Sequence, residues 1–97
     1  MNLRYLETFC VVAEAGSLTA AGQRLGMTQS AVSLQLQKLE REFGAKLVDR
    51  SRQPVVLTAA GESLLEQGRQ ILALYRTAQE DVQRAAESIQ GTLRLAA

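Results

Sequence analysis

The feature of this sequence that most limits its fold is a long helical pattern that begins at residue 59. Up to residue 89, apolar and small side chains alternate at spacings of four and three without a break, which is the a/d pattern of a coiled coil. At about 1.5 Å per residue such a helix is roughly 46 Å long. The 58 preceding residues are too few to cover it, so part of its apolar face needs another partner.

A second copy of the chain is the partner that we expect, because a/d patterns pair helices. The alternative is a helix that folds back on its own domain, although such a helix would overhang it. The residues expected to form the dimer interface are Leu64, Leu65, Ile71, Leu72, Tyr75, Ala78, Val82, Ala85 and Ile89.

Three shorter helices are expected before this one, over residues 3–15, 18–25 and 29 to about 42. Ser17 and Thr28 are placed to cap the second and third, because a hydroxyl oxygen can accept an unpaired backbone N–H of the first turn. The glycines expected to end the three helices are Gly16, Gly26 and Gly44. The apolar face of the third helix is predicted to carry Val32, Leu36, Leu39 and Phe43.

A small β-hairpin is expected between the third and the long helix. Residues 47–48 and 55–57 are short β-prone pieces, and the polar segment between them contains Pro54, the only proline. Thr58 is expected to cap the long helix. Beyond residue 89, Gly91 is expected to break that helix and to begin an alternating, strand-like run.

The composition makes most catalytic chemistry unavailable. The chain has no histidine, which excludes histidine bases, nucleophilic pairs and metal ligands. Its single cysteine, Cys10, lies on the apolar stripe of the first helix and is interpreted as a core residue rather than a reactive thiol. We expect no catalytic residue, no metal and no cofactor. We also expect no membrane segment, and a cytoplasmic location.

The second and third helices, with their three-residue connection, have the spacing of a helix-turn-helix. The face of the third helix opposite its apolar stripe combines short hydroxyls, an amide and an exposed leucine, a surface suited to base edges and phosphates. A hairpin with Arg50 and Arg52 follows at the position of a wing. The members of that face are Ser30, Ser33, Leu34, Gln37 and Arg41, with Lys38 at its edge.

The sequence resembles the N-terminal DNA-binding region of LysR-type transcriptional regulators. Residues 1 to about 61 match in order and spacing, and the long helix and Gly91 follow as in that family. The matching pieces are Leu3-Arg-Tyr-Leu-Glu-Thr-Phe9, Gly16-Ser-Leu-Thr-Ala-Ala21, Leu25-Gly-Met-Thr-Gln-Ser-Ala-Val-Ser33, Leu39-Glu40, Phe43-Gly44, Leu47-Val-Asp-Arg50 and Leu57-Thr-Ala-Ala-Gly61.

The resemblance implies a mainly α fold: a winged helix-turn-helix, with a three-helix core and a hairpin wing, followed by a long dimerisation helix. It implies a DNA-binding domain over residues 1–58, a linker helix over 59–89, and, over 90–97, a hinge and the start of an effector-binding domain absent here. Such bacterial regulators bind a pseudo-palindromic promoter site as dimers, commonly form tetramers at full length, and sense a small effector through that further domain. The implied DNA contacts are Thr28, Gln29, Ser30 and Ser33 from the third helix and Arg50, Arg52 and Pro54 from the wing.

Two positions depart from the family pattern. Leu34 stands where arginine is frequent, and Val48 stands where phenylalanine is usual. We consider two interpretations of Leu34, an apolar contact with a thymine methyl group or a merely tolerated surface leucine. For the whole domain, the alternative to DNA binding is a winged-helix module that binds only protein.

The net charge of +1 seems to argue against nucleic acid, but the charge is unevenly distributed. Residues 1–58 hold seven Lys and Arg against five Asp and Glu, whereas residues 59–97 hold four against five. Since electrostatic attraction depends on where charge lies, the small total predicts few phosphate contacts per subunit rather than none.

Overall fold

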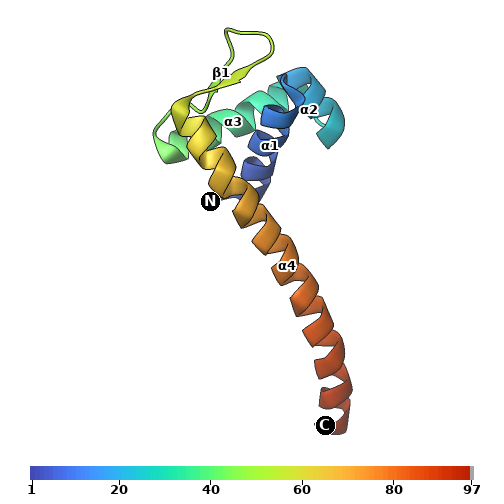
Figure 1. The fold of residues 1–97 in the computed structure, drawn as a ribbon. Helices are drawn as coiled ribbons and strands as arrows, with labels where there is room; N and C mark the ends of the chain where they lie inside the picture. Colours follow the sequence, from blue (N-terminus) through green and yellow to red (C-terminus); the bar gives the residue numbers. More distant parts are fainter. Residues whose placement is uncertain (97) are drawn as a thin grey trace.

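Four helices and one small hairpin make up the fold. The computed structural model describes the backbone of residues 1–96 and the side chains of residues 1–88. The first three helices cluster at one end, and the last leaves this cluster as a rod (Figure 1), so that the molecule measures 61 × 25 × 19 Å. The elements are α1 (Leu3–Ala15), α2 (Leu18–Leu25), α3 (Gln29–Phe43), β1 (Val48–Asp49), β2 (Val56–Leu57) and α4 (Ala59–Ala96).

The predicted caps are confirmed and explain where the helices begin. The Ser17 hydroxyl accepts the Ala20 N–H at 3.0 Å, and the Thr28 hydroxyl accepts the Ala31 N–H at 3.1 Å. Thr58 begins α4 in the same way, because its hydroxyl accepts a backbone N–H at 3.0 Å. All three predicted terminal glycines adopt the left-handed conformation that ends a helix.

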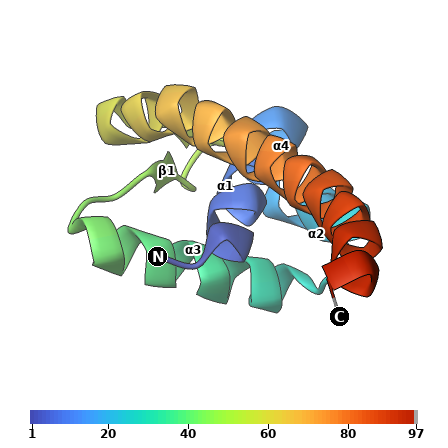
Figure 2. The same cartoon turned by 90° about the horizontal axis from the view of Figure 1, so that it is seen from below.

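The core lies where α1 passes between α3 and α4 (Figure 2). Cys10 is buried in it as predicted, and burial raises the pKa of its thiol. The fully buried apolar side chains are Leu6, Phe9, Val12, Ala21, Val32, Leu36, Leu39 and Leu47.

The prediction that Phe43 belongs to this core is wrong, because its side chain is 48% exposed. Helical angle gives the direction of a side chain but does not ensure that another element reaches it. Phe43 is the last residue of α3, one turn beyond the buried Leu39.

The far end of α4 also differs from expectation. The helix continues through Gly91 to Ala96, whereas the sequence predicted an end near residue 89 and a strand-like run. Leucine, arginine and alanine are good helix formers, and one interior glycine costs only about 1 kcal/mol. No helix among the described residues is long and apolar enough to cross a membrane.

The wing, residues 48–57, is fixed at its base. Val48 pairs with Leu57 and Asp49 with Val56 in antiparallel register. The Val55 N–H donates to the Gly16 carbonyl at 2.9 Å, which ties the returning strand to the end of α1. The wing is therefore anchored on the same cluster that holds α3.

Candidate nucleic-acid interface

The exposed face of α3 brings together most of the residues predicted to bind DNA. Thr28, Gln29, Ser30, Gln37 and Lys38 are exposed, and the Leu34 side chain is 50% exposed. Ser33 is half-buried beside them. Five of these residues line one shallow hollow on the surface: Gln29, Ser30, Ser33, Leu34 and Gln37.

Close packing of α2 against the connection to α3 sets the angle of this face. A β-carbon added to Gly22 would lie 2.5 Å from the Met27 carbonyl oxygen, so only glycine permits the approach. Sequence reasoning did not single out Gly22. Its signal was present, since Gly22 lies in the middle of a short helix, where glycine is unfavourable without a packing reason.

A second hollow continues the surface from α3 to the wing. It joins the start of α2, the start of α3 and the wing, and its polar lining combines hydroxyl, amide and guanidinium groups. The residues that line it are Ser17, Leu18, Thr19, Gln29, Ser33, Arg50, Gln53 and Val55. A ligand lying along α3 would meet this hollow next.

The two wing arginines, predicted to act together, are placed differently. Arg52 is exposed, with its side chain 70% accessible and its Nε 3.7 Å from an Asp49 carboxylate oxygen. Pro54 is exposed as well. Arg50 instead folds back on α3, where its Nη1 donates to the Ser33 hydroxyl oxygen at 2.7 Å. Arg52 is therefore the more exposed of the two wing arginines and the better placed to reach a phosphate.

Glu40 is the functional candidate that sequence reasoning missed. This carboxylate on α3 is only 6% exposed and accepts the N–H groups of Leu47 at 2.8 Å and Val48 at 3.4 Å. It also faces the ammonium of Lys46 at 3.8 Å and the guanidinium of Arg50 at 3.7 Å. The available signal was its position at the border of the apolar face of the helix, one turn after Leu36.

Lys38 lies at the edge of the interface, as the sequence predicted, and is exposed. Its ammonium is 5.7 Å from the centre of the Tyr5 ring on α1, within range of a cation–π contact. This contact directs the side chain toward α1.

The predicted dimer interface of α4 divides into two parts. Leu64 and Leu65 pack against the core, and Leu72 is 8% exposed, so these three residues belong to the domain itself. A second set of apolar side chains on α4, which begins at Ile71, is exposed to solvent, and we call it the α4 stripe. Its members are Ile71, Leu74, Tyr75 and Val82, which are exposed by 38%, 70%, 46% and 65%.

The small residues Ala78 and Ala85 are exposed beside this stripe, while Ile89 lies beyond the side chains that the structure describes. Leu74 was not predicted.

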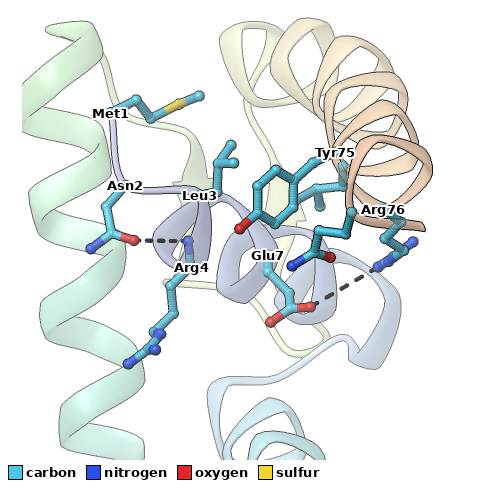
Figure 3. Close-up of a pocket in the computed structure, with 9 residues that line it drawn as sticks. Met1, Asn2, Leu3, Arg4, Glu7, Tyr75 and Arg76 are labelled. Atoms are coloured by element: carbon cyan, nitrogen blue, oxygen red, sulfur yellow. Dashed lines mark hydrogen bonds and ion pairs between the residues drawn. The ribbon is translucent and has the colours of Figure 1, made fainter. Parts of the chain in front are cut away.

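Next to the stripe, a groove separates the start of α1 from α4 (Figure 3), with Tyr75 and Arg76 on one side and Leu3 and Glu7 on the other. Arg76 and Glu7 form an ion pair across it at 4.0 Å.

Comparison with known proteins places this surface in context. The family model described as bacterial regulatory helix-turn-helix protein, lysR family, matches residues 3–62. The transcriptional regulator TfdT of Cupriavidus pinatubonensis is 43% identical over 95 residues, 98% of this chain and 42% of TfdT. BudR of Raoultella terrigena is 45% identical over 93 residues, 96% of this chain and 32% of BudR. The chain thus spans less than half the length of these relatives.

Two similar solved structures are DNA complexes. The BenM DNA-binding domain with catB site 1 DNA has a TM-score of 0.86 and 32% identity, covering 91% of this chain and 95% of that one. The DNA complex of the CbnR DNA-binding domain has a TM-score of 0.83 and 41% identity, covering 89% and 99%.

Proposed function

The chain belongs to the lysR family of bacterial regulatory helix-turn-helix proteins, and from this premise we propose that it is the sequence-reading, DNA-binding part of a transcriptional regulator. The observation that carries the proposal is the continuous surface formed by the exposed face of α3 and the wing. It offers hydroxyl, amide and apolar groups for base edges, with the exposed Arg52 beside them. Family members solved with DNA on the same fold support it.

In the proposed complex, α3 enters the major groove and the wing contacts the adjacent backbone or minor groove. Gln29, Ser30, Ser33, Leu34 and Gln37 face the bases. Thr28, Lys38, Arg52 and Pro54 contact the sugar-phosphate backbone. Arg50, which the resemblance placed among the DNA contacts, already contacts Ser33 and Glu40 of α3.

Binding measurements on single-base variants of a selected duplex test these roles. Replacing Gln29 with alanine should relax preference at one base pair by roughly 1–3 kcal/mol, whereas replacing Arg52 should weaken binding to every sequence. The Arg52 variant should also lower the dependence of log K on log salt by about one unit. The same uniform loss in both variants would refute the assignments. Absence of any salt-dependent duplex binding would instead favour a protein-interaction module.

Leu34 is proposed to contact a thymine methyl group, because its half-exposed apolar side chain lies in the middle of the base-facing hollow. Replacing Leu34 with arginine should weaken preference at one T·A pair even if the added charge raises overall affinity. A uniform gain at all sequences, with T·A preference unchanged, would show that Leu34 is a tolerated surface residue.

We propose that two copies pair through the α4 stripe, because it leaves four large apolar side chains in solvent beyond the core. Dimers present two copies of α3, as paired half-sites require. Sedimentation equilibrium tests this: V82E should weaken the dimer at least tenfold, while Q83E, a control that is also exposed but on another face, should not. Equal dimerisation of both variants would contradict the proposal.

For the whole regulator, we propose features that lie partly outside residues 1–97. We propose a DNA-binding domain over residues 1–58 and a linker helix from residue 59 that leads to an effector-binding domain; the hinge expected over 90–97 is not proposed, because α4 continues through Gly91 to Ala96. We also propose a tetramer, a small effector bound only by that further domain, and action on the nucleoid in the cytoplasm, and membership of a family of bacterial transcriptional regulators supports these proposals. The activity proposed for the whole regulator is effector sensing and promoter binding rather than catalysis.

A further inference from the structure

Arg50 and Glu40 form a polar connection between the wing and α3. Glu40 and Ser33 are seven residues apart, which places them two turns apart on nearly the same side of the helix. The Arg50 guanidinium bridges them, with Nη1 2.7 Å from the Ser33 oxygen and Nη2 3.7 Å from Glu40 Oε1. The other oxygen of Glu40 accepts the N–H of Leu47 at 2.8 Å, at the start of the wing.

The direction of the hydrogen bond between Arg50 and Ser33 is fixed by chemistry. Guanidinium groups donate and never accept, so the Ser33 oxygen is the acceptor and its own proton is not used in this bond. A charge-assisted bond of this kind also polarises the hydroxyl and makes it a better donor.

The Ser33 proton has no acceptor within the described side chains, residues 1–88. Serine and threonine hydroxyls in helices often donate to the carbonyl one turn earlier, as Thr8 does to the Arg4 carbonyl at 3.1 Å. Ser33 lines both hollows of the interface, so the unused proton lies at the surface where α3 would meet DNA.

We propose that Arg50 and Glu40 are positioning residues for base recognition: Glu40 holds Arg50, and Arg50 occupies one lone pair of the Ser33 oxygen, which favours donation of the Ser33 proton to a hydrogen-bond acceptor on a base edge. This inference rests on the proposed DNA binding. The major-groove acceptors are purine N7, guanine O6 and thymine O4, whereas cytosine presents an amino donor there. Ser33 should therefore prefer a base that offers an acceptor over cytosine at the position that it contacts.

The test is a binding comparison of the 97-residue chain with single-site variants. A preferred duplex is first selected from random sequence, and affinities are then measured for every single-base variant. S33A should remove about three- to tenfold discrimination against cytosine at one position. R50A should lose the same discrimination at that position, and the double variant S33A/R50A should show no further loss.

Two further variants separate positioning from folding. E40Q keeps an oxygen that can accept the Leu47 N–H but removes the charge that holds Arg50, so it should lose the same discrimination while its unfolding transition remains cooperative. K46A removes the other cation beside Glu40, whose side chain is 79% exposed, and it should leave the discrimination intact.

The outcomes distinguish this inference from the proposed function. If the wild-type chain binds with sequence preference, but R50A and E40Q reduce affinity equally for all sequences, the positioning role is overturned. It is also overturned if the S33A and R50A losses add. Failure of the wild-type chain to bind any duplex would overturn the proposed DNA binding itself.

Discussion

Replacing Gly61 with alanine should destabilise the protein, although alanine is the better helix former by about 1 kcal/mol. A β-carbon at this position would lie 2.0 Å from the Leu47 carbonyl oxygen and 2.9 Å from its carbonyl carbon. Ordinary contact begins near 3.4 Å, so the two backbones must separate by about 1.4 Å. That movement would break the 3.0 Å hydrogen bond from the Thr58 N–H to the same oxygen.

The expected magnitude follows from these opposing terms. Overpacking against backbone costs about 1–3 kcal/mol and the lost hydrogen bond about 1 kcal/mol, against the helix-propensity gain of about 1 kcal/mol. We therefore expect the Gly61→Ala variant to lose about 1–3 kcal/mol in free energy of unfolding. Urea denaturation followed by circular dichroism, at one fixed protein concentration, measures this loss.

Gly68 on the same helix provides the matched control. Its added β-carbon would lie 3.0 Å from the Leu6 Cδ1, the end of a side chain that needs to yield only about 0.4 Å. The Gly68→Ala variant should therefore remain within about 1 kcal/mol of the wild type, because the propensity gain offsets the strain. If both variants changed stability equally, or if Gly61→Ala were stabilising, the backbone-contact reasoning would be refuted.

Three further predictions concern the core and the wing. Leu36→Ala should lower the free energy of unfolding by about 2–5 kcal/mol, while Phe43→Ala should lower it by less than about 1 kcal/mol, because only Leu36 is fully buried. Urea denaturation measures both changes, and comparable losses would contradict the exposure of Phe43. Burial raises the pKa of the Cys10 thiol above its ordinary 9.0, so the stability that the buried thiol contributes is lost as pH rises from 9.0 through the pKa of the folded state. Iodoacetamide should therefore label Cys10 far more slowly in the native protein than in urea. Equal labelling rates would rule out a buried thiol. Hydrogen bonds from Ser51 lower the pKa of the Asp49 carboxyl below its ordinary 3.8. The stability that this carboxylate contributes is therefore present above pH 3.8 and is lost as pH falls through the lower pKa of the folded state. An NMR titration of the Ser51 amide should have its midpoint below 3.8, and a midpoint at or above 3.8 would count against these hydrogen bonds.

The helices and their caps were predictable because each depends on residues close together in the chain. Ser17, Thr28 and the glycines at 16, 26 and 44 supply local hydrogen bonds and backbone conformations, and these hold in the structure. Periodicity located the buried face of α3 for Val32, Leu36 and Leu39 for the same reason.

Features that depend on tertiary contact were not predictable in this way. Glu40 acts on the wing through Leu47 and Arg50, which are brought to it by the turn after α3 rather than by helical spacing. Arg50 looked equivalent to Arg52 in sequence, and only the path of the hairpin directs one toward α3 and leaves the other exposed. Charge pattern identifies the cations of a wing but not their partners.

The long apolar pattern of α4 shows why one periodic signal can combine two interfaces. Leu64, Leu65 and Leu72 serve the core, whereas the α4 stripe points elsewhere, and a repeat of four and three does not separate the two sets. The first part of α4 is held against α1 by contacts within the chain, including the ion pair of Arg76 with Glu7. Folding of the three-helix cluster should therefore survive dilution, while DNA affinity falls as the copies separate. Because the second copy binds at an effective concentration set by the linkage, its loss should weaken DNA binding by about 10²–10⁴-fold.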